Sequence, residues 1–168
     1  MPVPQSPSRA LVASAALMAA IVASATALAC GSDNNVLTPT TTTFTTTLNG
    51  AGENPAKNVP GTGTATIVKS GGTYTFTINY TGMSGALTGG HIHGPAGIGV
   101  NAAVIVPFAN ANGAPASGTL TGTFTSTNTP TISNDSLDVL MSNGNAYVNL
   151  HTAANPGGEI RGQLLKQP

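Results

Sequence analysis

The sequence has very few charged residues. Only 6% of its 168 residues are charged, and five Lys and Arg balance five Asp and Glu. Nucleic acids and anionic membrane surfaces are recognised through excess positive charge, so this composition excludes both as partners. The chain is nevertheless expected to fold, because 40% of its residues are apolar and many of them alternate with Thr, as in β-strands.

Cysteine is also scarce, since Cys30 is the only one and no internal disulfide can form. The preceding residues 10–29 are uncharged and consist of Ala, Leu, Val, Ile, Met, Ser and Thr, with Arg9 as the only charge before them. This pattern is typical of an export signal. The run nearly suffices to span a membrane, but Ala27 and Ala29 form a small-residue cleavage site directly after it. We therefore expect residues 1–29 to be a cleaved signal peptide.

The position of Cys30 directly after this site resembles that of the acylated cysteine in bacterial lipoproteins. Those proteins usually carry Leu where Ala27 stands, and an ordinary signal peptidase would also accept this sequence, so simple secretion is the alternative. Gly31 follows the cysteine in place of Asp, which by the same resemblance favours the outer membrane or cell surface. Residues 30–41 have no apolar periodicity and are expected to form a flexible tether between the lipid anchor and the domain.

Short alternating stretches separated by Gly, Pro and Asn fill residues 42–168. In the clearest of them Tyr74, Phe76 and Ile78 share one face and threonines share the other, which predicts a strand with one buried and one solvated face. Gly71 and Gly72 before it predict a tight hairpin. The expected strands are Thr42 to Asn49, Gly63 to Lys69, Thr73 to Tyr80, Ala103 to Phe108, Gly118 to Thr125, Asn145 to Thr152 and Glu159 to Lys166.

One stretch has helical spacing. Leu137, Leu140 and Met141 follow a possible cap at Ser133 or Asn134, and Gly144 is well placed to end a short connector helix. Together with about seven or eight strands, this predicts an all-β fold, a Greek-key antiparallel β-sandwich or barrel of superoxide-dismutase-like or immunoglobulin-like type.

The three histidines of the chain, His91, His93 and His151, lie in two short segments. Residues two apart in a strand point to the same side, so His91 and His93 can converge on one ion while Ile92 faces the core. The same alternation places Tyr147, Asn149 and His151 opposite the apolar Val148 and Leu150. In the last strand it places Glu159, Arg161 and Gln163 outward, opposite Ile160 and Leu164.

These segments would share one polar face if they are neighbours in the fold. Three imidazoles on a β-surface suit copper or zinc, so His91, His93 and His151 are the candidate ligands. An ion pair between Glu159 and Arg161 would either orient an imidazole or only hold the strands. The alternative is that the histidines form hydrogen bonds and bind no ion. Because the face is expected to be solvated, Val148→Asp should unfold the domain and Asn149→Asp should not.

Three motifs resemble the signature of CHRD (chordin) domains. They begin at His91, Ala146 and Gly157 and read HIHGPA, AYVNLHT and GGEIRGQ, and the likeness extends over roughly Thr42 to Leu165. The resemblance implies an extracellular β-domain with no established enzymatic activity. A weaker likeness to copper/zinc superoxide dismutase would make the three histidines copper ligands, but the chain lacks the further histidines and the cysteine pair of that enzyme.

We therefore expect an exported binding module that faces the cell surface or periplasm and holds copper or zinc. Tyr147, Asn149, Glu159 and Arg161 are expected to support the three histidines or to contact a ligand. A structural or adhesion domain without metal is the alternative, and a dismutase-like enzyme is the third reading. The expected partner is a protein, a glycan or the metal ion itself, with membrane contact only through the lipid on Cys30.

Overall fold

The computed structural model describes residues 40–125 and 132–168, which belong to one compact unit. The expected signal peptide, Cys30 and almost all of the tether lie outside these described residues. In the part of the chain that is described, no helix has the length and apolar character needed to cross a membrane.

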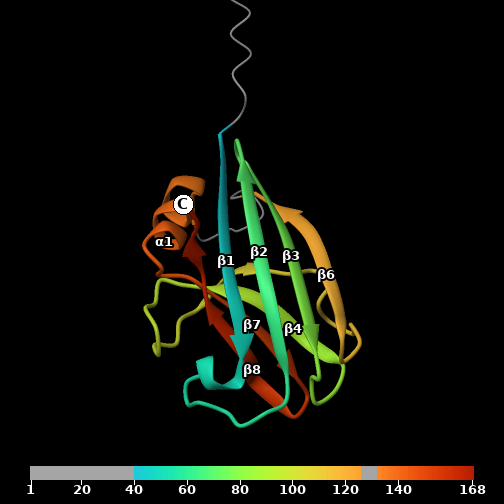
Figure 1. Cartoon of the computed structure of the whole chain (residues 1–168). Helices are drawn as coiled ribbons and strands as arrows, with labels where there is room; N and C mark the ends of the chain where they lie inside the picture. Colours follow the sequence, from blue (N-terminus) through green and yellow to red (C-terminus); the bar gives the residue numbers. More distant parts are fainter. Residues whose placement is uncertain (1–39, 126–131) are drawn as a thin grey trace, which may run out of the picture. The chain divides into compact units, whose positions relative to one another are not determined.

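The described residues form an antiparallel β-fold with one short α-helix, as predicted (Figure 1). One half of the sheet consists of β1 (Thr41–Asn49), β2 (Thr62–Ser70), β3 (Thr73–Thr81) and β6 (Gly118–Phe124). The other half consists of β4 (Leu87–His93), β5 (Val104–Pro107), β7 (Tyr147–Thr152) and β8 (Asn155–Gln163). The remaining elements are the 3₁₀-helix η1 (Gly50–Gly52), the α-helix α1 (Asn134–Ser142) and the short strand β9 (Leu165–Lys166).

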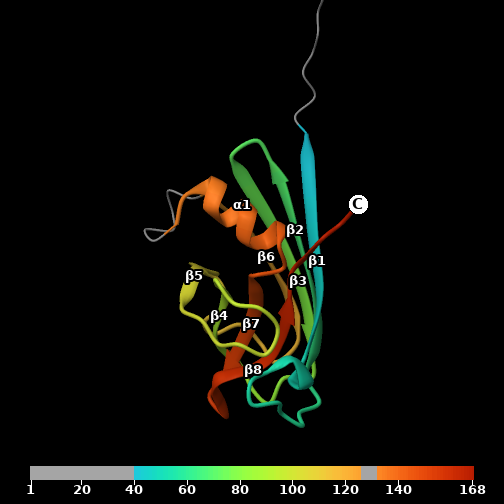
Figure 2. The ribbon, with the colours of Figure 1, turned by 90° about the vertical axis from the view of Figure 1, so that its left-hand side faces the viewer.

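The strands follow the order β5-β4-β7-β8-β1-β2-β3-β6, and β9 pairs with β1. The two halves meet where Asn49 of β1 pairs with Arg161 of β8. β6 returns beside β3 and β7 returns beside β4, which are connections of the Greek-key kind. The halves face each other as two layers of a nearly closed barrel, with the core between them (Figure 2).

Alternation in the sequence correctly predicts the core face of the strands. Tyr74, Phe76, Ile78 and Tyr80 of β3 are all buried, whereas the threonines between them remain exposed or half-exposed. In the opposite layer Ile92, Val148, Leu150 and Ile160 are fully buried. Burial of one such side chain contributes about 1.5–3 kcal/mol, so contact between the layers is the main source of stability.

The predicted connector helix forms at the expected place. Ser133 is the N-cap, and its hydroxyl accepts a hydrogen bond from the backbone N–H of Ser136 at 3.3 Å. Leu137 and Met141 are completely buried, so α1 covers one end of the core. Asp138 on the same helix forms an ion pair with Lys69 of β2, which fixes the helix to the sheet.

β4 carries the histidine pair but is absent from the strands expected from alternation. Its sequence contains Gly89 and Gly90, which weaken the alternating pattern. A Cβ atom at Gly90 would lie 2.8 Å from Cδ2 of Leu150 and 3.2 Å from Cδ2 of Phe108. The glycine is therefore required by close packing in the core, which a local pattern does not show.

Candidate metal centre

The three histidines come together on neighbouring strands. β4 and β7 pair so that His93 lies opposite Tyr147, His91 opposite Asn149 and Gly89 opposite His151. One ring nitrogen from each histidine lies within 4.8 Å of those from the other two. The expected clustering of imidazoles from two segments is therefore present.

Gly89 leaves open the space between the rings of His91 and His151. It faces the same side as His91 and lies opposite His151, so a side chain there would stand between the two imidazoles. A Cβ atom at Gly89 would lie 3.1 Å from Cε1 of His91 and 4.0 Å from Cδ2 of His151. Because glycine leaves this volume open, Nδ1 of His91 reaches to 3.1 Å from Nε2 of His151.

Two backbone carbonyls determine which nitrogen of each ring carries a lone pair. Nδ1 of His93 lies 2.9 Å from the carbonyl oxygen of Ala102, and Nδ1 of His151 lies 3.0 Å from that of Pro156. A carbonyl only accepts, so both Nδ1 atoms donate and both Nε2 atoms carry lone pairs. In histidines that bind metal ions, the other ring nitrogen commonly donates a hydrogen bond of this kind, which orients the ring.

The Nε2 atom of His93 is buried and has no hydrogen-bond partner among the described residues. A buried nitrogen acceptor without a partner costs about 1–3 kcal/mol, so it requires an explanation. His151 Nε2 accepts the Nδ1–H of His91 instead. The lone pairs of the two Nε2 atoms and, after a change of tautomer, Nδ1 of His91 are thus available to one ion.

All three imidazoles are held in the neutral form that binds metal ions. Burial lowers the pKa of His91 to about 4, and the neighbouring His151 and His93 add to this effect. Burial also lowers the pKa of His93 and of His151, in each case against a hydrogen bond to a carbonyl that raises it. The rings are therefore neutral at neutral pH.

The spacing of the nitrogens fits an ion after a small adjustment. Zinc–nitrogen bonds of about 2.0–2.1 Å limit the separation of two ligand nitrogens to about 4.2 Å. Nδ1 of His91 and Nε2 of His151 are 3.1 Å apart, which is within that limit. The ligand nitrogens of all three histidines lie within 4.8 Å of one another, a distance slightly above the limit. A small rotation of one imidazole, which moves its nitrogen by a few tenths of an ångström, brings all three nitrogens within the limit.

Tyr147 supports His93 in two ways. The two rings stack with centroids 4.8 Å apart and an angle of 2° between their planes. The Tyr147 hydroxyl oxygen accepts the backbone N–H of Ala102 at 3.1 Å, and Ala102 in turn accepts the Nδ1–H of His93. Tyr147 therefore fixes both the plane of the imidazole and the carbonyl that sets its tautomer.

Arg161 lies on the other side of Tyr147. Its guanidinium carbon is 3.3 Å from the centre of the Tyr147 ring, a cation–π arrangement. Arg161 donates to the Asn101 side chain at 3.0 Å and to the Val100 carbonyl at 2.8 Å. These contacts attach the loop after β4 to the sheet, so Arg161 is only 2% exposed. The expectation that this polar face is solvated is wrong at Arg161 and at Asn149, because loops cover this part of it.

Asn149 is also buried on this face, at 3% exposure. Its Nδ2 donates to Oε1 of Glu53 at 2.8 Å, and burial raises the pKa of the Glu53 carboxyl, although Asn149, Arg161 and Lys57 act to lower it. Glu53 is not among the residues that strand alternation places on this face. It ends η1 in a loop that folds over β7, and no local pattern predicts that contact.

Glu159 does not join the histidines. Its carboxylate accepts from the Ser84 backbone at 2.7 Å, from the Ser84 and Thr152 hydroxyls and from Asn155 at 3.1 Å. The register between β7 and β8 shifts between Leu150 and Thr152, so Thr152 pairs with Asn155. The Thr152 hydroxyl, which faces away from the imidazoles, donates to the Glu159 carboxylate. The suggested ion pair between Glu159 and Arg161 is therefore not formed.

The register shift depends on Gly158. Its φ of +124° lies in the region that favours glycine. A Cβ atom there would also lie 2.5 Å from Nδ2 of Asn149 and 2.7 Å from Oε1 of Glu53. Gly158 thus redirects Glu159 and leaves space for the Asn149–Glu53 contact.

Comparison with known proteins identifies one match. Residues 44–164 match the family model described as CHRD domain. No curated protein and no solved structure matches the chain. The matched region includes all three histidines, Tyr147 and Arg161.

Proposed function

The chain belongs to the CHRD-domain family, and we propose that it is a binding module that holds one copper or zinc ion through His91, His93 and His151. The observation that carries this proposal is the buried, unpartnered Nε2 of His93. It points to a ligand because Nδ1 of the same ring and the hydroxyl of the stacked Tyr147 already have partners.

The donor set determines which ions are candidates. Three neutral imidazoles without a carboxylate or thiolate suit zinc and copper, and a three-residue site leaves a fourth position for water or an external ligand. His91 and His151 are only half-buried, so that position is reached from solvent. Divalent copper is expected to bind more tightly than zinc, following the general affinity order of first-row metals.

Metal content after equilibrium dialysis tests the proposal. The protein, prepared without a histidine tag and exposed to Cu²⁺ or Zn²⁺, should retain one ion per chain. His91→Ala, His93→Ala and His151→Ala should each reduce the retained metal, and the triple variant should retain none. Asn112→Ala, in an exposed loop outside the site, is the matched control and should bind as the parent does.

The alternative is a structural or adhesion domain in which the histidines only form hydrogen bonds. It predicts no stoichiometric metal in the parent protein, or metal that survives the triple substitution. Melting curves of all variants establish that loss of metal does not result from unfolding.

We also propose that the chain is exported and anchored by a lipid on Cys30, with the domain at the cell surface or in the periplasm. The apolar run of residues 10–29 and the position of Cys30 directly after Ala29 support this. Cys30→Ser should release the protein from the membrane fraction and remove the lipid mass. Unchanged membrane retention of that variant would contradict the anchor.

A further inference from the structure

The outer face of β1, β2, β3 and β6 is almost entirely threonine. On each of these strands the positions that alternate with the core residues face away from the barrel. The outward threonines are Thr41, Thr43, Thr45, Thr47, Thr62, Thr64, Thr66, Thr73, Thr75, Thr77, Thr81, Thr119, Thr121 and Thr123. We call this set the threonine face, and no described segment crosses in front of it in Figure 1.

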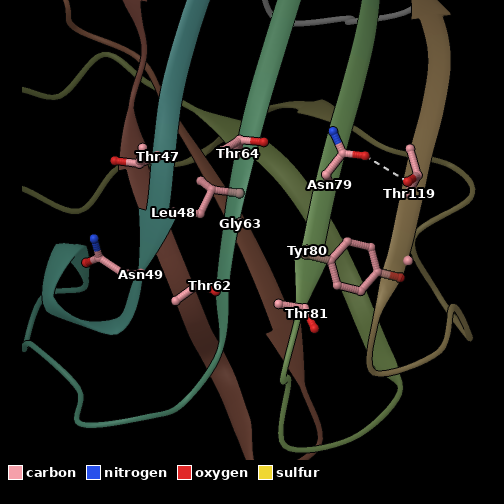
Figure 3. Close-up of a pocket in the computed structure, with 11 residues that line it drawn as sticks. Thr47, Leu48, Asn49, Thr62, Gly63, Thr64, Asn79, Tyr80, Thr81 and Thr119 are labelled. Atoms are coloured by element: carbon pink, nitrogen blue, oxygen red, sulfur yellow. Dashed lines mark hydrogen bonds between the residues drawn. The ribbon is translucent and has the colours of Figure 1, made fainter.

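The threonines lie in ranks that cross all four strands. The pairings place Thr45, Thr66, Thr77 and Thr121 side by side in one rank. The neighbouring rank is Thr47, Thr64, Asn79 and Thr119, which Figure 3 shows at one level across the sheet. These three pairings have no register shift, whereas pairings in the other half do. Ranks therefore repeat about every 6.6 Å along the strands and about every 4.8 Å across them.

The chemistry of this face is uniform. The other outward positions carry Asn49, Asn79, Val68 and Ser70, so the face has no charged and no aromatic side chain. Thr119 donates to Oδ1 of Asn79 at 2.8 Å. In the rank of Thr45, Thr66, Thr77 and Thr121, by contrast, the side-chain hydroxyls have no hydrogen bond to any described residue. Threonine is β-branched and has few χ1 rotamers, so each hydroxyl and methyl group keeps its place in the array.

We propose that the threonine face binds the surface of an ice crystal. Ice presents oxygen atoms in a regular two-dimensional array, at spacings similar to those between these ranks and strands. A preorganised array of hydroxyl and methyl groups loses little side-chain entropy on contact with such a surface. Charged groups would hold their own hydration shells instead, and none is present on this face. The absence of exposed aromatic rings, the usual platforms for sugar rings, favours ice over a polysaccharide.

Sheet twist limits how strong this binding can be. Neighbouring strands rotate by roughly 20–25°, so only part of the face can lie flat on one crystal plane. The rank that includes Thr64 and Asn79 also borders a shallow hollow of about 630 Å³, where water can order between protein and crystal. The expected activity is therefore inhibition of ice recrystallisation rather than a large depression of the freezing point.

Partition into slowly grown ice tests the proposal with the intact chain. The parent protein should be enriched in the ice fraction relative to serum albumin, an inert protein, and should inhibit recrystallisation. Thr66→Lys with Thr77→Lys places two charges at the centre of the face and should reduce the enrichment by about tenfold. Asn112→Lys adds a charge in an exposed loop elsewhere and should leave it unchanged.

Any of four results would overturn the proposal. The parent protein could be excluded from ice like the inert protein, or the double variant, with an unchanged melting temperature, could enter ice as the parent does. Retention on insoluble polysaccharide or a dimer that Thr66→Lys dissociates, without ice enrichment, would assign the face to that partner. His91→Ala should not affect ice binding, so failure here and failure of the metal proposal are separable.

Discussion

Gly89 shows how a single missing side chain shapes the histidine cluster. Its hydrogen atom faces the space between His91 and His151, which any Cβ atom would enter. Gly89→Val should therefore displace one imidazole and weaken metal binding by at least about tenfold, with little change in melting temperature. Gly85→Val is the matched control, because no atom lies within 4 Å of a Cβ atom there. Equal metal affinity in the two variants, measured by calorimetric titration, would show that the space is not needed.

Asn149 and Val148 are adjacent, and both are buried. A carboxylate at position 149 would lie next to Glu53 and would lose the hydrogen bond that Asn149 now donates. Asn149→Asp should therefore reduce the free energy of unfolding by several kcal/mol, as Val148→Asp should. This reverses the sequence-based expectation that only Val148→Asp is severe. Urea denaturation checks it, with Asn112→Asp as the exposed control; a stability of Asn149→Asp equal to that of the control would contradict the buried contact.

Strand alternation predicts which residues share a face, but not what covers that face. It correctly grouped His91, His93, Tyr147 and Asn149. The tautomers of the imidazoles depend on the backbone carbonyls of Ala102 and Pro156. The positions of backbone carbonyls cannot be predicted from a sequence pattern. The residue types therefore predict which side chains are candidate ligands, whereas the orientation of the imidazole rings depends on the fold.

The turn between β7 and β8 is an element whose geometry is set by one carboxylate. Ser84, Thr152 and Asn155 donate to Glu159 and, against the effect of burial, lower its pKa below the ordinary value of 4.5. The ionised form therefore stabilises the fold above pH 4.5, and this contribution is lost as the pH falls through the lower pKa of the folded state.

Glu159→Gln removes this titration. The variant should lose about 1–3 kcal/mol at pH 7, because an amide nitrogen cannot accept the hydrogen bonds that a carboxylate oxygen accepts. Its free energy of unfolding should also fall less than that of the parent between pH 5 and the acid-unfolding region. Parallel curves for the two proteins would mean that Glu159 does not contribute to the acid sensitivity.

Elements with clean alternation are the ones that the sequence predicts well. β1, β2, β3 and β6 consist of Thr alternating with apolar residues and form close to their expected bounds. β4 lacks the alternation of apolar and polar residues because of its glycines, and β8 changes register at Gly158. Both exceptions adjoin the candidate site, where close packing and a turned strand matter more than amphipathic patterning.

At the scale of the whole domain, metal binding should appear as added stability. The two histidine-bearing strands belong to one cooperative sheet, so an ion bound only by the folded state stabilises the entire unit. At a free-metal concentration of 100 Kd this amounts to about 2.7 kcal/mol, a rise in melting temperature of roughly 10 °C. The triple histidine variant should show no rise, and an equal rise in that variant would place the metal elsewhere.

The fold class followed from composition and turn spacing, because strands of this length bury a core only by facing another layer. The order of strands did not, since the returns of β6 to β3 and of β7 to β4 depend on contacts between distant residues. Likeness to superoxide dismutase and export through Cys30 remain predictions.

Nitrogen-15 NMR of the histidine rings, before and after one equivalent of Zn²⁺, tests the metal site most directly. We expect Nε2 of His93 and His151 and Nδ1 of His91 to shift as coordinated nitrogens, while Nδ1 of His93 and His151 stay protonated. Ring resonances that do not change with saturating metal, or coordination through Nδ1 of His93, would contradict this expectation.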